Sequence, residues 1–373
     1  MAKKKTPRYK KLLGFVYIGI SALLIYTLGV NAYRVIGQKQ QLVQLEERKA
    51  ELQKEKQELS KEVELLTDDD YVARYAREQY IFPDDDEEVI KLPKSKKISS
   101  GLFFCLVKGG FEMFVSFCFP MKALKREREI TVYLPDDYYR TQKNYPVLYI
   151  QDGQNAFFDY LSYSGISWGF LEYVKETGMD IIMVAIPCNE EGFKRMDEYG
   201  PWPINDVLSY QETQQDGLII GGEGQAYIEW LKDELKPYID CRFRTQKENT
   251  GIVGSSMGAV ISAYAAFQYP EVFQKCAALS TAFWFYVDEF IDIIEHQDYD
   301  QSNRFYLDLG EFESGDDKII NQWYIESNQQ IYEHLEPKVE NLQVHYFPGA
   351  HHNESEWRER VPLFMSFLYE EDV

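Results

Sequence analysis

Hydrophobic and polar residues follow three different patterns along the 373-residue chain. Residues 12–33 carry no charge, and as a helix rising about 1.5 Å per residue they are long enough to cross a bilayer. Leucines then recur every seven residues within 38–67, as in a coiled coil. From Met113 onward, short strand-like runs alternate with longer helical stretches. The pattern predicts a transmembrane helix and a coiled coil followed by an α/β domain.

The first eleven residues form a basic tail with six lysines or arginines and no acidic residue. This asymmetry predicts a single-pass protein of the cell membrane whose N-terminus stays in the cytoplasm. A cleaved signal peptide is the alternative. However, the apolar run of 12–33 is longer than a usual signal core, and no small-residue cleavage site follows it. We therefore expect the anchor to be retained.

The predicted coiled coil has one complete row of leucines and one mixed row. The complete row consists of Leu45, Leu52, Leu59 and Leu66. Lys49 and Lys56 occupy two core positions of the mixed row, and a polar core residue selects a partner at a cost in stability. This favours pairing with a helix of different sequence. Residues 68–92 then predict a short helix followed by an acidic tail.

Residues 12–92 resemble the septum formation initiator family, the small single-pass divisome proteins of the DivIC type. The resemblance rests on the basic tail, the apolar run, the leucine heptads, "DDDYVARYAREQY" and "EEVIKLP". It implies a non-catalytic role in cell division. It also implies that the coiled coil pairs with other divisome membrane proteins.

The longer part, residues 113–373, shows the alternation of an α/β fold. "REREITVYLP", "YPVLYI" and "DIIMVAIP" predict strands, whereas "GQAYIEWLKDELKPYI" and "AVISAYAAFQYP" predict helices. Apolar runs such as "YPVLYI" are typical of strands that are buried on both faces of a parallel sheet. We therefore expect a mostly parallel sheet covered by helices.

The candidate nucleophile is Ser256 in Gly254-Ser255-Ser256-Met257-Gly258, which fits G-x-S-x-G. An apolar strand precedes this motif and a helix of small residues follows it, as in the nucleophile elbow of α/β hydrolases. Such a turn is so tight that side chains at the glycine positions would clash. It raises the serine above the sheet and directs the next amide, that of Met257, at a developing oxyanion.

A serine nucleophile needs a histidine base, which follows the serine in this fold. Two of the five histidines, His351 and His352, lie just beyond a predicted strand, where catalytic loops belong. His296 and His334 fall in polar helical stretches, and His345 lies inside the strand. Position alone does not choose between His351 and His352.

The orienting acid is expected in "RFYLDLGEFESGDD", which reads as a strand that runs into a loop. Glu313 is the candidate in the loop. Asp308 lies within the predicted strand, and Asp316 lies further out. Each is equally compatible with ordinary surface charge, so the pattern leaves the acid open.

Residues 113–373 resemble the esterase family of α/β hydrolases that includes enterochelin, feruloyl and acetylxylan esterases and S-formylglutathione hydrolases. The resemblance rests on "REREITVYLP", "YPVLYIQDGQNAF", "YIEWLKDELKPYID", "VGSSMGA", "YLDLGEFE" and "GAHHNESEW". It implies an α/β-hydrolase fold and hydrolysis of an ester substrate through an acyl-enzyme, without a cofactor.

The resemblance also assigns roles by motif position. Ser256 matches the nucleophile and His352 matches the base. Glu313 matches the acid, at a position where many relatives carry aspartate. The backbone amides of Gln154 and Met257 match the oxyanion hole. Several aromatic residues near these motifs would suit an apolar or aromatic group of the substrate, although aromatic residues are more often part of the core.

Composition narrows the partners. The formal net charge of −21 argues against nucleic acid, because phosphate contacts need clustered lysines and arginines. The five cysteines are widely spaced and form no metal-ligand or disulfide pattern. Free thiols suit a reducing compartment, which favours the cytoplasmic side for the hydrolase.

Residues 93–112 join the two parts, and we expect them to be unstructured. One interpretation is a linker that tethers the hydrolase outside the membrane, and another is a second transmembrane helix over 101–119. The third is a translated gap between two genes. The codons of "KGGFEM" can spell a ribosome-binding site before a start at Met113. In the third case the hydrolase is a separate cytoplasmic protein.

Overall fold

The structure is a computed structural model that describes residues 101–107, 110–204 and 220–370. Contacts divide the chain between Pro93 and Lys94, and all the described residues belong to the second unit. The predicted anchor at 12–33, the coiled coil at 38–67 and the segment 68–92 lie outside the described residues. No helix within the described ranges is long and apolar enough to cross a membrane.

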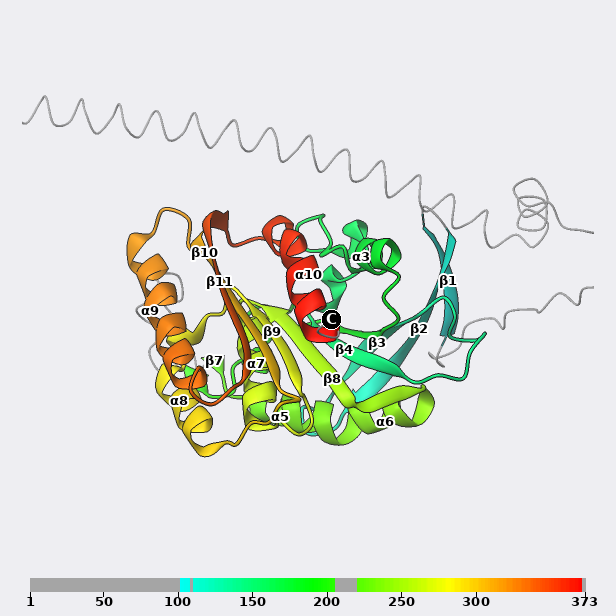
Figure 1. Cartoon of the computed structure of the whole chain (residues 1–373), viewed down its shortest axis with the longest axis horizontal. Coiled ribbons are helices and arrows are strands. Elements are labelled where there is room, and N and C mark those ends of the chain that lie inside the picture. The colour runs from blue at the N-terminus through cyan, green and yellow to red at the C-terminus, as the bar shows by residue number, and fades with distance from the viewer. Residues whose placement is uncertain (1–100, 108–109, 205–219, 371–373) are drawn as a thin grey trace, which may run out of the picture. The chain divides into compact units, whose positions relative to one another are not determined.

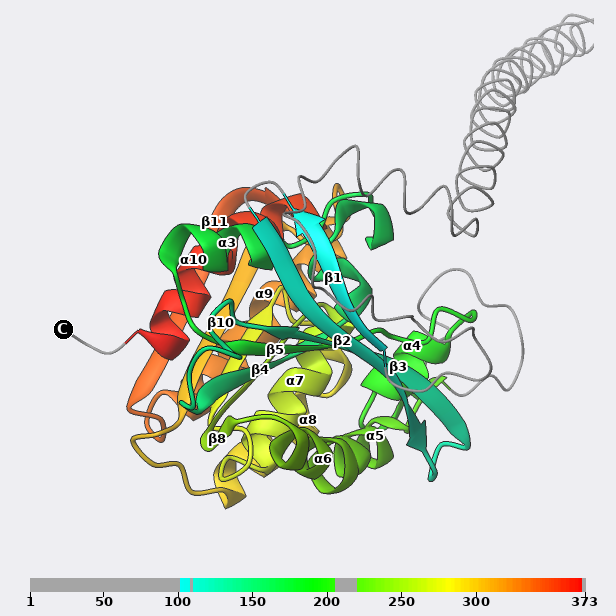
Figure 2. The same ribbon diagram turned by 90° about the vertical axis from the view of Figure 1, so that its right-hand side faces the viewer.

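The described unit is built around a nine-stranded sheet (Figures 1 and 2). In spatial order its strands are β1 (Gly101–Val107), β2 (Gly110–Met121), β3 (Arg126–Leu134), β5 (Ile182–Ile186), β4 (Tyr145–Gln151), β8 (Thr245–Ser255), β9 (Lys275–Leu279), β10 (Arg304–Phe312) and β11 (Asn341–His351). The strands from β5 to β11 are parallel, whereas β1, β2 and β3 are antiparallel to their neighbours. The prediction of an α/β fold with a mostly parallel sheet is therefore confirmed.

Helices cover both faces of the sheet, with α3 and α10 on one face and α5 to α8 on the other (Figure 1). Their bounds are α3 (Phe170–Thr177), α4 (Lys194–Tyr199), α5 (Gly224–Trp230), α6 (Lys236–Arg242), α7 (Met257–Gln268), α8 (Val287–His296), α9 (Lys318–Leu335) and α10 (Glu354–Tyr369). A π-helical turn, Leu231–Leu235, joins α5 to α6. A separate small sheet pairs β6 (Pro203–Ile204) with β7 (Ile220–Gly221).

Strand β4 shows why these runs of residues become central strands. Val147 and Tyr149 belong to the core on one face, and Leu148 and Ile150 belong to the core on the other. Successive side chains of a strand point to opposite faces, so a continuous apolar run fills both layers at once. This arrangement brings the carboxyl ends of the parallel strands to one edge, where ligands bind in open α/β sheets.

The junction differs from the prediction. Residues 93–112 were expected to be unstructured and the first strand to begin at Met113, but β1 covers Gly101–Val107 and β2 already begins at Gly110. The two strands form an antiparallel hairpin with seven registered residue pairs. Pairing with β2 satisfies the backbone polar groups on one side of β1, which a linker would leave to water. The alternative of a second transmembrane helix over 101–119 is also wrong, because the described residues of this range form strands.

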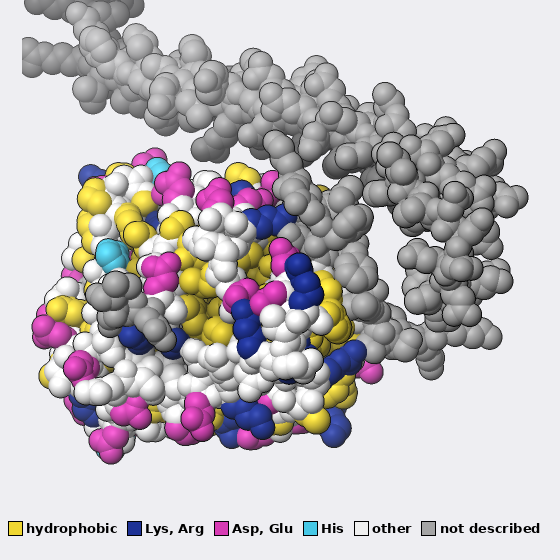
Figure 3. All heavy atoms as spheres, turned by 45° about the vertical axis from the view of Figure 1, so that its right-hand side comes forward, with side chains coloured by type: hydrophobic (Ala, Val, Ile, Leu, Met, Phe, Trp, Pro, Cys, Tyr) yellow, Lys and Arg dark blue, Asp and Glu magenta, His cyan; other side chains and the backbone are white. Residues whose placement is uncertain are grey.

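Charged side chains of both signs are interspersed over the face shown in Figure 3, with hydrophobic side chains between them. The lysines and arginines on this face are not gathered into one basic patch. Opposite charges also pair locally, as Lys143 does with Asp137 and Asp180.

Candidate active site

Ser256 lies in a strained turn between β8 and α7. Its φ of 57° and ψ of −122° are a conformation that residues other than glycine rarely adopt. A Cβ atom on Gly254 would lie 2.1 Å from the carbonyl oxygen of Gly258, and one on Gly258 would lie 2.7 Å from Asp152 Oδ2. Both glycines are therefore required by close packing, as the motif predicts. Ser255 is buried, whereas Ser256 is partly exposed.

His352 and Glu313 meet at the same edge of the sheet. Glu313 directly follows β10 and His352 directly follows β11, and these strands are parallel neighbours. His352 Nδ1 lies 2.5 Å from Glu313 Oε2, and the backbone amide of Gly310 donates to Glu313 Oε1 at 2.5 Å. The Glu313 side chain is 1% exposed and that of His352 is 25% exposed. The imidazole is thus held by a buried carboxylate while part of the ring remains accessible.

The surroundings of Glu313 favour its ionised form. Burial acts to raise the pKa of Glu313, but the hydrogen bond and charge of His352 act to lower it. Hydrogen bonds from the Gly310 amide and from Ser280 act in the same direction, so the pKa lies below its ordinary value. The carboxylate is therefore available as an acceptor through the neutral range.

The other two candidate acids are placed elsewhere. Asp308 Oδ1 accepts from Arg360 Nη1 at 2.8 Å and from the Ser280 amide at 3.1 Å, inside the protein. Burial raises the pKa of Asp308 to about 6, although Arg360 acts to lower it. Asp316 is exposed in the turn before α9. Of the three acids, the structure brings only Glu313 to His352.

The remaining histidines have other surroundings. His351 is exposed, and its ring stacks on Phe312 with centroids 5.1 Å apart. His345 stacks between the rings of Tyr306 and Phe347, which is the packing role expected from its place in the strand. His296 and His334 lie in the last turns of α8 and α9, away from the sheet edge that carries His352.

Contacts between strand ends connect Ser256 with His352. The Ser256 amide donates to the Leu279 carbonyl at the end of β9, and the indole of Trp357 donates to Ser280 Oγ at 2.9 Å. The Trp357 ring packs edge-on against His352 with centroids 5.0 Å apart. No hydrogen bond joins Ser256 to His352 in the described part of the chain. Hydrogen bonds of this kind are often long in proteins without a bound substrate.

The two amides predicted for the oxyanion hole both lie in first turns of helices. Met257 is the first residue of α7, and Gln154 lies in a short 3-10 helix, η1 (Gly153–Asn155), directly after β4. The first N–H groups of a helix have no acceptor within it. A Cβ atom on Gly153 would lie 2.3 Å from the Ile186 nitrogen, so the loop packs tightly on the end of β5.

Arg195 is a residue at this site that the sequence analysis missed. Its Nε donates to Asp152 Oδ1 and its Nη2 donates to Asp152 Oδ2, both at 2.7 Å. Asp152 directly precedes η1, which carries Gln154. The chain offers no spacing signal for this pair, because 43 positions separate the two residues.

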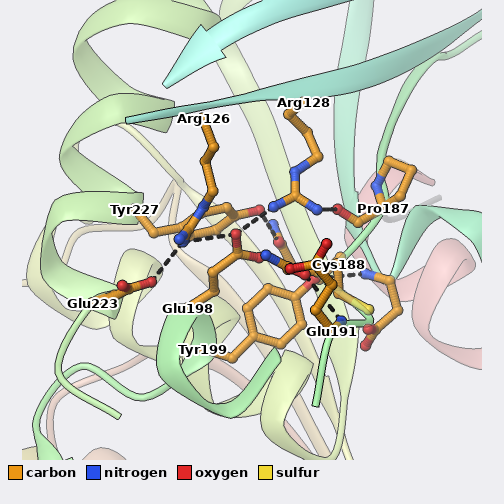
Figure 4. Close-up of polar contacts among 12 residues, drawn as sticks. Arg126, Arg128, Pro187, Cys188, Glu191, Glu198, Tyr199, Glu223 and Tyr227 are labelled. Atoms are coloured by element: carbon orange, nitrogen blue, oxygen red, sulfur yellow. Dashed lines mark hydrogen bonds and ion pairs between the residues drawn. The ribbon is translucent and has the colours of Figure 1, made fainter. Parts of the chain in front are cut away.

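A second polar cluster missed by the sequence analysis lies next to Arg195. The carboxylate of Glu198 is fully buried between Arg126 and Arg128, as Figure 4 shows. Arg126 also pairs with Glu223 at 2.6 Å. Alternating charges in "REREITVYLP" were the available signal, but in a strand they equally predict an exposed face.

For metals, the described residues hold no group of three or more histidine, cysteine, aspartate or glutamate side chains placed to bind an ion.

A family model described as "Putative esterase" matches residues 121–364, well over half of the chain. The chain belongs to this esterase family. Protein YbbA of Bacillus subtilis, described as uncharacterized, is 24% identical over 250 residues, covering 65% of this chain and 92% of that protein. The family and the fold agree with the expected hydrolase of the esterase type.

Solved structures show the same fold at low identity. An IroE-like serine hydrolase from Shewanella oneidensis is 18% identical with a TM-score of 0.56, covering 69% of this chain and 79% of that chain. The BES protein from Bacillus cereus is 17% identical with a TM-score of 0.53, and the match covers 74% of this chain and 99% of that chain. At such identities the likeness establishes the fold alone.

The N-terminal part matches a second family model, "Septum formation initiator", over residues 17–95. This match confirms the resemblance stated from the heptads and motifs. The chain thus combines a segment similar to the septum formation initiators with an esterase-family domain.

Proposed function

We propose that the esterase-family domain is a serine carboxylesterase with Ser256 as nucleophile, His352 as base and Glu313 as orienting acid. The observation that carries the proposal is the short contact between the buried Glu313 carboxylate and His352 Nδ1, at the sheet edge that also bears the strained Ser256 turn. A carboxylate on Nδ1 fixes the tautomer and leaves Nε2 to accept a proton.

In the proposed mechanism, His352 Nε2 takes the proton of the Ser256 hydroxyl as Oγ attacks the ester carbonyl carbon. The amides of Gln154 and Met257 stabilise the oxygen of the tetrahedral intermediate. The intermediate collapses to an acyl-enzyme, and the leaving alkoxide takes the proton from His352. Water then attacks the acyl-enzyme with His352 again as the base, which releases the acid and restores Ser256.

We assign the alcohol or acyl group of the substrate to an aromatic or apolar class. Phe157, Trp168 and Phe283 are core residues, but Trp284 and Phe285 are only partly buried. The Trp284 ring lies 5.5 Å from that of Trp323, which is 37% exposed. Tyr324, the residue after Trp323, has its ring 5.9 Å from His352. These rings support an apolar surface beside the proposed base.

The activity is tested with the purified full-length chain and p-nitrophenyl acetate or butyrate. We expect turnover that falls by at least about 10³-fold in Ser256→Ala, because the nucleophile is lost. A fluorophosphonate probe should label the unaltered chain at Ser256. Ser302→Ala, in an exposed turn, is the matched control and should keep full activity. Equal turnover by folded Ser256→Ala would refute the proposal.

For the N-terminal part we propose an anchor at 12–33 and a coiled coil at 38–67 that pairs with divisome membrane proteins. The septum-formation-initiator match supports this role. It also supports the second candidate function, a division scaffold whose hydrolase fold is a passenger. A folded full-length chain that neither turns over esters nor reacts with the fluorophosphonate would favour that scaffold.

Whether one polypeptide carries both parts is tested by an immunoblot of the native source with an antibody to the C-terminus. Full-length protein in the membrane fraction would support a tethered esterase. A shorter band in the soluble fraction would support a separate cytoplasmic hydrolase and a translated gap near 93–112. In the second case the nucleotide sequence at Lys108–Gly110 should contain the ribosome-binding site.

A further inference from the structure

Arg195 contacts both backbone segments that supply the predicted oxyanion-hole amides. Besides its two bonds to Asp152, Arg195 Nη2 lies 3.4 Å from the Ser255 carbonyl oxygen, to which it donates. Asp152 begins the turn that carries Gln154, and Ser255 ends the strand before Ser256 and Met257. One guanidinium group therefore joins the two segments.

Asp152 needs such support because of its backbone conformation. Its φ of 50° and ψ of 45° lie in the left-handed region, which costs energy for a residue that is not glycine. Its amide donates to the Tyr199 hydroxyl at 2.9 Å, and its side chain is 3% exposed. Its Oδ2 packs so closely on Gly258 that a Cβ atom there would lie 2.7 Å away. The carboxylate is thus wedged between the Gln154 turn and the start of α7.

Helix α4 positions Arg195 beside Asp152. The helix has only six residues, too few to be stable without tertiary contacts. Arg195, Glu198 and Tyr199 share one face of it, at spacings of three and four residues. Figure 4 shows Glu198 of this face held by Arg126 and Arg128, with Tyr199 beside it. The buried ion cluster therefore anchors the helix face that carries Arg195.

We propose that Arg195 is a positioning residue that sets the separation of the Gln154 and Met257 amides through Asp152 and Ser255. The inference rests on the proposed esterase function. The bidentate geometry matters because a planar guanidinium fixes both carboxylate oxygens at once, which an ammonium group does not. Displacing one amide by about an ångström weakens transition-state stabilisation much more than substrate binding.

The test compares steady-state hydrolysis of p-nitrophenyl butyrate by full-length Arg195→Met, Arg195→Lys and the unaltered chain. We expect Arg195→Met to lower kcat by about 10- to 100-fold with KM changed less than about threefold. Arg195→Lys should lie between, because it keeps the charge but loses the fork. Affinity for a trifluoromethyl ketone, which forms an oxyanion on Ser256, should fall in parallel with kcat. A role in folding alone would not produce that parallel.

Lys194→Gln is the matched control, because Lys194 lies on the same helix, pairs with Asp197 and has a side chain 48% exposed. It should leave kcat unchanged. Asp152→Asn keeps the shape of the partner and serves as the second variant if Arg195→Met does not fold. If the two residues act as one device, Asp152→Asn combined with Arg195→Met should be no slower than Arg195→Met alone.

The outcomes separate this inference from the function on which it rests. If the unaltered chain shows no Ser256-dependent turnover, the proposed esterase function is wrong. If the unaltered chain is active and a folded Arg195→Met or Asp152→Asn variant keeps its kcat, the positioning role is overturned. Independent, multiplying losses in the double variant, or a loss confined to KM, would also overturn it.

Discussion

At the scale of single residues, the geometry around His352 distinguishes between the three candidates for the orienting acid, which the sequence pattern left open. Glu313 is buried, bonded to His352 Nδ1 and fixed by the Gly310 amide. Asp308 is equally buried, but it is bonded to Arg360 instead. What distinguishes them is the loop beyond β10, which turns the side chain of Glu313 back toward β11. Such a return depends on the turn geometry and not on residue type.

Glu313→Gln tests this assignment directly. We expect kcat for p-nitrophenyl esters to fall by about 10³- to 10⁴-fold, because an amide in place of the carboxylate no longer holds the imidazole in the required tautomer. The comparison is Asp316→Asn, which changes an exposed acid three residues away and should keep full activity. An active Glu313→Gln enzyme, with Asp308→Asn inactive but folded, would transfer the role to Asp308.

The buried pair of Asp308 and Arg360 predicts a pH dependence of stability. Burial raises the pKa of Asp308 to about 6 in the folded protein, whereas an aspartate in the unfolded chain titrates near pH 4. Between about pH 4 and pH 6, Asp308 therefore keeps its proton in the folded state but has released it in the unfolded state. The stabilisation from this group is fully present below about pH 4 and is lost as the pH rises through about 6.

Urea unfolding of the full-length chain and of Asp308→Asn at pH values from 4 to 7 measures this effect. The advantage of the unaltered chain over the variant should shrink with rising pH by on the order of 2 kcal/mol, at about 1.4 kcal/mol per pKa unit. Tryptophan fluorescence reports this domain alone, because all six tryptophans lie between Trp168 and Trp357. A difference that stays constant or grows with pH would show that Asp308 remains ionised throughout.

Residues of the candidate site were predictable where a local motif fixes the backbone. The Ser256 turn needs glycines on both sides, so it leaves a pattern in the sequence. The bond between Arg195 and Asp152 needs only that α4 lie against the end of β4. That placement depends on the fold, so no spacing along the chain reveals the pair.

At the scale of elements, the turn between β8 and α7 connects two buried elements and carries Ser256, the proposed nucleophile. Gly254 packs against the Gly258 carbonyl and Gly258 against Asp152, so β8, α7 and the turn that carries Gln154 are held together by close contacts. All but one of the α7 residues are buried, which fixes the helix on which the turn depends. The strain at Ser256 persists because its surroundings determine it from both sides.

Gly254→Ala should therefore be far more damaging than an equivalent change in a loop. Its Cβ atom would lie 2.1 Å from a backbone oxygen, and backbone atoms cannot move aside as a flexible side chain does. We expect loss of soluble protein, or of several kcal/mol of stability together with activity. Gly165→Ala, at a positive φ of 77° but with nothing within 4 Å of the added Cβ atom, should cost only about 1 kcal/mol. Thermal unfolding and turnover of both variants decide the matter, and equal effects would contradict this account.

The central strands were predictable because a run of apolar residues fills both faces of a parallel sheet. The hairpin of β1 and β2 was not, because its apolar run equally fitted a linker or a membrane span. An edge strand takes its stability from one neighbour, and the sequence does not state which neighbour is available. Seven registered pairs with β2 settle this in the structure.

At the scale of the whole molecule, the division between Pro93 and Lys94 lies two residues before the end of the septum-formation-initiator match at 95 and well before the start of the esterase match at 121. The esterase unit therefore includes β1, although the family match begins only at residue 121. This bears on the hypothesis of a translated gap, in which a hydrolase starting at Met113 would lack β1 and the first residues of β2. Such a protein would present β2 as an unpaired edge.

Fragments 94–373, 101–373 and 113–373 test whether β1 belongs to the folded unit. We expect the first two to unfold at the same temperature, because they differ only before β1. The third should unfold on the order of 5 °C lower, because it loses the pairing of β1 with β2. For a domain of this size, each loss of about 1 kcal/mol in the free energy of unfolding lowers the unfolding temperature by about 2–4 °C. It should also self-associate through the exposed edge of β2.

Tryptophan fluorescence melting and light scattering supply these measurements. If 113–373 is monomeric, melts with the longer fragments and hydrolyses esters equally well, β1 adds nothing to the unit. The translated-gap hypothesis would then gain support, because a hydrolase beginning at Met113 would be complete by itself. If 113–373 is destabilised as expected, the pairing of β1 with β2 argues that residues 101–112 evolved as part of this hydrolase, whichever polypeptide carries it in the cell.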